Sequence, residues 1–127
     1  MQHPFQYVLV RYVPRVDRGE FVNVGVIVHS QSAGVLRALT HLDEERVRAF
    51  DPEVDLTALY AALAALETGC DARATDRSDE LTSLGKRFGW FAAPRSTVVQ
   101  PGPVHGGSSA DPAAAADELL DRLVRLR

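Results

Sequence analysis

The sequence predicts an α+β fold, with a small antiparallel sheet of about four strands covered by three or four helices. Segments rich in β-branched and aromatic residues follow one another at 5–13, 21–30 and 34–40, separated by short polar connections. Leucines at helical spacing then mark residues 56–66 and 119–123. Strands grouped before most of the helices favour an antiparallel sheet over an alternating parallel one.

Each strand has its own signal. Residues 5–13 (FQYVLVRYV) are mostly apolar on both alternate faces, as in a central strand that is buried on two sides. Residues 21–30 (FVNVGVIVHS) form the clearest strand, and the turn QSAG joins it in a hairpin to a third strand at 34–40. Prolines bracket a fourth strand at 95–100 and prevent continuous ladder pairing there. The even positions of the second strand form a purely apolar face of Val22, Val24, Val26 and Val28.

Helices are expected in four places. Thr40 with Asp43 resembles a capping box and predicts a short helix that ends near Phe50. Asp51-Pro52 is a start signal for the leucine-rich helix that Gly69 ends. Further helices are expected from Leu81 to Gly89 and after Asp111-Pro112.

Bulk properties narrow the class of protein. The length of 127 residues and the 46% of hydrophobic residues suit one domain over residues 1–127. A single cysteine gives no sign of an oxidising compartment, and no apolar run approaches the length of a membrane span. We therefore expect a cytoplasmic protein without membrane attachment. The net charge of −3 disfavours nucleic-acid binding through a basic field.

Familiar catalytic and metal-binding patterns do not occur in the sequence. The four histidines and the one cysteine are scattered without paired ligand spacing, so we expect no metal and no cofactor. Ser96, His105 and Asp111 offer the residue types of a catalytic triad, but a trio of this kind occurs somewhere in most chains of this size. Whether the protein is an enzyme stays open, and a non-catalytic role is favoured.

The first candidate site lies on the predicted hairpin. If Val13 lies opposite Phe21, then Arg11 lies opposite Asn23 and Leu9 opposite Gly25. Arg11 and Asn23 would then share one sheet face beside a glycine that leaves room for a ligand. The alternative is a buried polar pair, bonded internally or to Glu20, with Gly25 marking a β-bulge.

The second candidate site follows the third helix, in the region 83–110, which contains basic residues and no acid. One arginine with hydroxyl and amide donors suits a phosphate or carboxylate group. The alternative is an arginine that binds helix carboxyl ends next to a proline-fixed strand. Trp90 and Phe91, just before it, are interpreted as core anchors. Together the two sites comprise Arg11, Arg18, Glu20, Asn23, Arg95, Ser96, Thr97, Gln100 and His105.

These two regions also carry a family resemblance. RGEFVNVGVIV at 18–28 and RFGWFAAPRSTVVQPGPVHGGSSADP at 87–112 resemble the signature stretches of a bacterial family known as domain of unknown function 3037. The similarity covers nearly the whole chain. One departure is Gly106-Gly107, where the family pattern leads us to expect a bulkier second residue.

The resemblance implies a partner rather than a reaction. Genes of this family often lie beside a gene for a HipA-like kinase, which favours a non-catalytic accessory domain that binds a protein. The alternative is a small enzyme or sensor that binds a phosphate- or carboxylate-bearing ligand. A homodimer formed through an exposed edge strand also stays open.

Overall fold

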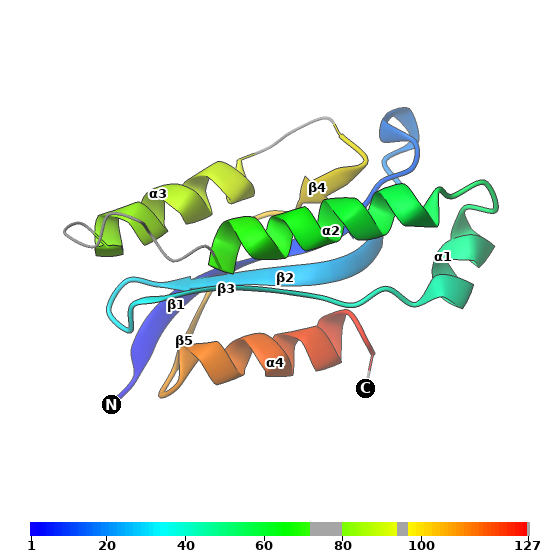
Figure 1. Ribbon diagram of the computed structural model, residues 1–127. Helices are drawn as coiled ribbons and strands as arrows, with labels where there is room; N and C mark the ends of the chain where they lie inside the picture. Colours follow the sequence, from blue (N-terminus) through cyan, green and yellow to red (C-terminus); the bar gives the residue numbers. More distant parts are fainter. Residues whose placement is uncertain (72–79, 94–96, 127) are drawn as a thin grey trace.

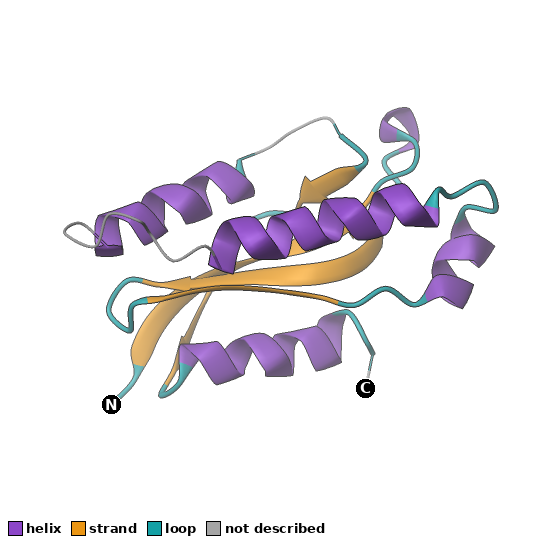
Figure 2. Ribbon diagram, viewed as in Figure 1, coloured by secondary structure: helices purple, strands orange, loops and turns teal. Residues whose placement is uncertain are grey.

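The computed structural model describes residues 1–71, 80–93 and 97–126, with the backbone alone at 71 and 80–83. Within these ranges, five strands form one antiparallel sheet with helices on both faces (Figures 1 and 2). The predicted α+β class is confirmed. No helix in the described ranges is both long and apolar enough to cross a membrane.

The sheet has the strand order β3-β2-β1-β4, and β5 pairs with β1 beside β4. β1 is therefore central, as predicted, and two short strands share its outer edge. The strands are β1 His3–Tyr12, β2 Val22–Ser30, β3 Val35–Thr40, β4 Val99–Pro101 and β5 His105–Ser109. The helices are α1 Glu44–Phe50, α2 Leu56–Asp71, α3 Glu80–Ala92 and α4 Pro112–Leu123, with a 3-10 turn at Val16–Arg18.

The outer edge of the sheet has the expected fourth strand and one strand more than expected. The predicted strand at 95–100 is found as Val99–Pro101, where the chain pairs with Val10 to Tyr12, and residues 95 and 96 lie outside the described residues. The fifth strand, His105–Ser109, was not expected, since its sequence HGGSS has low β-propensity. It forms because the first half of β1 presents backbone groups that need partners. Gly107 makes room for the Phe5 ring, since a Cβ atom there would lie 2.5 Å from Cζ of Phe5 unless that ring moved.

A β-bulge reverses the expected faces of β2. Arg11 lies opposite Asn23 as predicted, but Gly25 lies opposite Val10 rather than Leu9, which leaves Val24 as an extra residue. The predicted single face of even-numbered valines is consequently split. Val22 and Val24 pack on the side of α1, α2 and α3, whereas Val26 and Val28 pack beneath α4.

The helices cover the two faces unequally. α2 and α3 lie on one face, α4 lies on the other, and α1 sits at the end of the sheet (Figure 1). Leu59 and Leu63 of α2 and Phe88 of α3 pack on Val8, Val10 and Ile27, which forms the larger core. The smaller core joins α4 to the opposite face of β2 through Leu119, Leu120, Val124, Val26 and Val28.

Two helix starts differ from the sequence prediction. α1 begins after Asp43, whose carboxylate accepts from Arg46 N at 3.2 Å, while Thr40 stays in β3 and donates to Glu67 of α2 at 2.7 Å. α2 begins after Asp55 rather than at Asp51-Pro52. The start of α4 at Asp111-Pro112 is confirmed. Each helix begins where a side chain accepts a hydrogen bond from a free backbone amide of the first turn, and a sequence motif alone does not show which side chain does so.

Candidate functional site

Three of the predicted site residues meet on the α4 side of the sheet. Arg11 lies opposite Asn23 on β2 and opposite Gln100 on β4, so the three side chains project from one face across adjacent strands. The Arg11 guanidinium lies over the Phe21 ring, with 3.9 Å between its Cζ and the ring centroid. Gly102 makes this position possible, since a Cβ atom there would lie 2.9 Å from that same Cζ.

The Arg11–Asn23 pair is held by packing more than by hydrogen bonds. Asn23 Nδ2 donates to the carbonyl of Leu123 at the end of α4, at 3.3 Å. Arg11 Nε and Asn23 Oδ1 are both buried without a hydrogen-bond partner in the described structure. A donor and an acceptor on neighbouring side chains can be joined by one small movement or one bridging water. This arrangement agrees better with the buried polar pair than with a ligand pocket.

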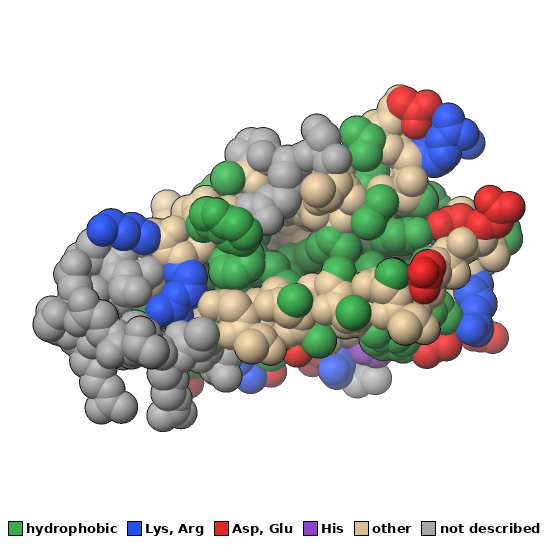
Figure 3. Space-filling model, turned by 45° about the horizontal axis from the view of Figure 1, so that its top comes forward, with side chains coloured by type: hydrophobic (Ala, Val, Ile, Leu, Met, Phe, Trp, Pro, Cys, Tyr) green, Lys and Arg blue, Asp and Glu red, His purple; other side chains and the backbone are tan. Residues whose placement is uncertain are grey.

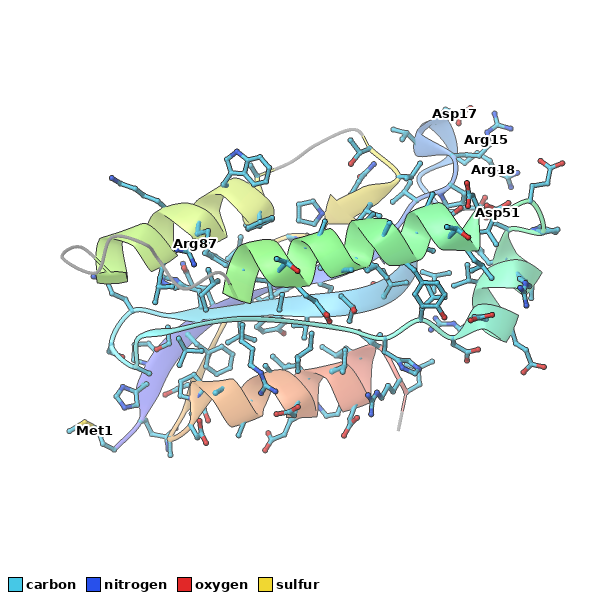
Figure 4. All side chains as sticks on the ribbon, viewed as in Figure 1. Met1, Arg15, Asp17, Arg18, Asp51 and Arg87 are labelled. Atoms are coloured by element: carbon cyan, nitrogen blue, oxygen red, sulfur yellow. The ribbon has the colours of Figure 1, made fainter. Side chains whose placement is uncertain are left out.

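The other predicted residues that the structure describes are not gathered with Arg11. Arg18 forms an exposed ion pair with Glu20, at 2.6 Å, in the β1–β2 connection (Figure 4). Thr97 donates to the carbonyl of Val99, at 2.6 Å, which is a local turn contact. Arg95 and Ser96 lie outside the described residues.

His105 lies beside the middle of β1, away from Arg11. It pairs with Tyr7, with 5.2 Å between the ring centroids, and Tyr7 is four residues from Arg11 along the strand. At about 3.3 Å per residue, the two positions are roughly 13 Å apart. The described residues therefore do not assemble one anion pocket from Arg11 and His105.

A feature that sequence reasoning missed lies on the opposite face. An apolar groove runs between α2 on one side and α3 and β4 on the other, and it encloses about 380 Å³. Hydrophobic side chains line this hollow in the space-filling view (Figure 3). The floor comes from Val10 and Ile27, which belong to the core. The walls are Ala62, Ala65 and Leu66 of α2, Trp90 and Phe91 of α3, and Val99, Gln100 and Pro101.

Local sequence explains how the groove forms. Leu59 and Leu63 direct α2 onto the sheet, which leaves Ala62 and Ala65 on the flank that faces the groove. Because these side chains are small, α2 does not extend over the floor of the groove. At the end of α2, a Cβ atom on Gly69 would lie 2.6 Å from Cζ of Phe91, so this glycine allows the close approach of α3.

Trp90 corrects another expectation. It was interpreted as a core anchor, yet it is 64% exposed, and it meets Phe91 edge to face with 5.0 Å between the ring centroids. Tryptophan buries a large apolar area and carries one polar handle, so it is enriched at the centres of protein interfaces. An exposed tryptophan would have pointed to a binding surface, but the sequence does not show whether Trp90 is exposed.

The α1 end of the groove is acidic. Val99 on the groove wall pairs with Tyr12, whose hydroxyl donates to Asp51 at 2.6 Å. Burial, this hydrogen bond, and the charges of Asp51 and Asp55 raise the pKa of Tyr12 to about 12. Glu53 donates its backbone amide to Asp51 at 3.2 Å and lies exposed between them. Three acidic residues thus lie in the segment that leads into α2, just beyond the residues that line the groove.

The comparison with family models decides the family. The model described as protein of unknown function (DUF3037) matches residues 7–124. The chain belongs to the DUF3037 family. The match spans nearly the whole chain and includes every element that lines the groove. Neither the curated proteins nor the solved structures contain a match to this DUF3037 chain.

The groups in the DUF3037 core that could do chemistry are unreactive or isolated. Cys70 is 1% exposed, and burial raises the pKa of its thiol to about 12, although the charge of Arg87 acts in the opposite direction. A thiol in this state is a poor nucleophile. Within the described ranges, no three His, Cys, Asp or Glu side chains lie close enough to hold a metal ion.

His29 is the other buried titratable group. It is 7% exposed and stacks on Phe88 of α3, with 5.2 Å between the ring centroids. Its Nε2 has no hydrogen-bond partner in the described structure, and burial lowers its pKa from the ordinary value of 6.5. Both folded and unfolded chains are neutral at His29 above that value. Below it the unfolded chain takes up the proton first, so stability falls as the pH falls.

Replacing His29 with phenylalanine is expected to stabilise the protein by about 1 kcal/mol near pH 7, because an unpartnered buried nitrogen is removed while the ring stack is kept. The gain in stability is expected to increase at about pH 5. There the wild type is destabilised by protonation of His29 in the unfolded chain, whereas the variant has no histidine at this position. Urea unfolding at both pH values measures it, with His105→Phe as the exposed control. A variant less stable than the wild type, or an unchanged pH dependence, would contradict this account of His29.

Proposed function

We propose that this chain is a non-catalytic accessory domain that binds a partner protein, and that it holds an apolar segment of that partner in the groove between α2, α3 and β4. The observation that carries the proposal is the groove itself, an apolar hollow floored by Val10 and Ile27 and flanked by the exposed Trp90. Filling such a hollow removes apolar surface from water on both molecules.

The groove is better suited to a protein segment than to a small polar ligand. The side chains that line it are apolar apart from the indole N–H of Trp90, because the β1–β4 register turns the Gln100 side chain toward the other face. Pockets for small molecules usually combine apolar walls with several converging polar groups. Of the predicted cationic and hydroxyl residues that the structure describes, Arg11 lies on the other face, and Arg18 and Thr97 pair locally at the surface. This distribution favours the binding role over the alternative of an anion-binding enzyme or sensor.

A HipA-like kinase is the proposed partner, because the family resemblance carries that expectation. Co-expression followed by size-exclusion chromatography at micromolar concentration is the test. The two proteins are expected to elute together. Separate elution would remove this kinase as the partner.

Replacing Trp90 with alanine is expected to weaken the complex about 30-fold, the loss typical of a tryptophan at an interface centre. The free energy of unfolding should change by about 1 kcal/mol or less, because the side chain is largely exposed. Tyr60→Ala is the matched control, since Tyr60 is an exposed aromatic residue on α2 that does not line the groove. Equal affinity of the Trp90 and Tyr60 variants, measured by titration calorimetry, would place the interface elsewhere.

A further inference from the structure

Among the described residues, the groove occupies a place in the helix layer that no helix fills. α2 packs along one side of it, and the floor is formed by the adjacent strands β1 and β2 through Val10 and Ile27. α3 reaches it only with its last turn, at Trp90 and Phe91. Helices that pack side by side are about 8–10 Å apart, and small residues at the contact allow the shorter spacing. Ala62 and Ala65 provide such a contact along α2.

A strand is a poorer occupant than a helix. β4 could accept an added strand only along its outer edge, and it is three residues long, ending at Pro101. Pro101 and Pro103 have no amide hydrogen to donate, and short edges with prolines resist strand pairing. The side chains of an amphipathic helix, in contrast, enter an apolar groove at i, i+3, i+4 and i+7 and leave the polar face in water.

The charges at the α1 end determine which helix fits. Asp51, Glu53 and Asp55 lie there, and none forms an ion pair within 4 Å among the described residues. The nearby arginines of the β1–β2 connection do not neutralise them, because Arg15 pairs with Asp17 and Arg18 with Glu20 (Figure 4). Among the described residues, the acidic segment at this end of the groove therefore has hydrogen-bond donors but no cationic partner.

On the basis of the proposed function, we infer that the groove takes an amphipathic helix that runs antiparallel to α2, with lysine or arginine in its last turn. Basic side chains stabilise the C-terminal end of their own helix. Placed beside Asp51, Glu53 and Asp55, that end lies against the first turn of α2, so the two helix dipoles are antiparallel. In this one orientation the helix buries its apolar face in the groove, places its basic residues beside the acidic ones, and has its dipole antiparallel to that of α2.

The test uses synthetic peptides of about 18 residues, or five turns. They carry a hydrocarbon staple, because free helices of this length are marginal in water. One peptide has an apolar stripe with arginines in the last turn, a second has the same stripe with the arginines in the first turn, and a third has scrambled order. None contains tryptophan, so the emission of Trp90, the single tryptophan of the chain, reports occupancy of the groove.

The first peptide is expected to shift Trp90 emission to the blue and to bind about tenfold more tightly than the second at low salt, because several exposed ion pairs each add a small gain. The preference should shrink at high salt. Glu53→Lys should abolish it, and Glu118→Lys on α4, which changes the net charge equally, should leave it intact.

Equal affinity of the first two peptides, or no loss of preference with Glu53→Lys, would overturn the inferred orientation but not binding in the groove. A scrambled peptide that binds as well as the first, or no binding by any peptide, would overturn the helical occupant. The proposed function fails on a different result, namely equal affinity of the Trp90 and Tyr60 variants for the partner protein.

Discussion

Replacing Gly25 with alanine is expected to lower the free energy of unfolding by about 2–3 kcal/mol, the range of a poorly tolerated overpacking change. Gly25 is buried in the bulge of β2, between β1 and β3. A Cβ atom there would lie 2.8 Å from the carbonyl oxygen of Leu39 and 3.1 Å from Cγ2 of Thr40. The first of these atoms is backbone in a paired strand, so it cannot move without loss of sheet hydrogen bonds.

The measurement is urea unfolding, supported by a fall in Tm of about 10 °C. Gly89→Ala is the matched control, because a Cβ atom on Gly89 would meet nothing within 4 Å and the residue lies in α3. That variant should gain about 0.5–1 kcal/mol from helix propensity. If Gly25→Ala were as stable as Gly89→Ala, the close approach of β1, β2 and β3 at the bulge would be wrong.

Replacing Ala65 with arginine is expected to abolish partner binding at micromolar concentration. Ala65 is exposed on the groove wall, and a long cationic side chain there would lie in or across the groove. Burying an unpaired charge against Val10, Ile27 or Leu66 costs several kcal/mol, more than most interface contacts contribute. Arginine is nearly as good a helix former as alanine, so the fold should keep its stability within about 0.5 kcal/mol.

Ala64→Arg supplies the matched control for this change. Ala64 is also exposed on α2, but helix geometry places it on the opposite flank, toward the side where Glu67 binds Thr40 of β3. The two variants have the same composition and charge. Titration calorimetry with the partner should therefore give wild-type affinity for Ala64→Arg and no binding for Ala65→Arg. Equal affinities would exclude this wall of the groove from the interface.

Sequence reasoning succeeded where local chemistry determines structure. The β-branched and aromatic runs gave β1, β2 and β3, and the Arg11–Asn23 pairing followed from the length of the connection. The alternative of a β-bulge marked by Gly25 is confirmed, but the pairing of Gly25 with Leu9 was wrong, since the bulge shifts the register by one residue and so moves Val26 to the other face. Sequence reasoning also missed β5, whose HGGSS sequence pairs through backbone groups that the rest of β1 leaves open.

The candidate site was harder to predict for a physical reason. The sequence shows which polar residues suit an anion site, but not whether they lie close together. Their proximity depends on the strand face that each occupies and on its position along β1, which separates His105 from Arg11. The groove has no sequence motif. It arises because Leu59 and Leu63 set the rotation of α2, so that Ala62 and Ala65 face a part of the sheet that no described helix covers. The groove therefore depends on how segments that are distant in the sequence pack together, which no local pattern shows.

The central claim, that a partner protein binds in this groove, is tested most directly at Trp90. Incorporating 5-fluorotryptophan gives the chain one fluorine signal, since it contains a single tryptophan, and an unlabelled kinase contributes none. When the complex forms, as judged by size-exclusion chromatography, the fluorine resonance is expected to shift as the indole leaves water, and Ala65→Arg should prevent the shift. A complex that forms while the resonance stays at its free position would contradict the account.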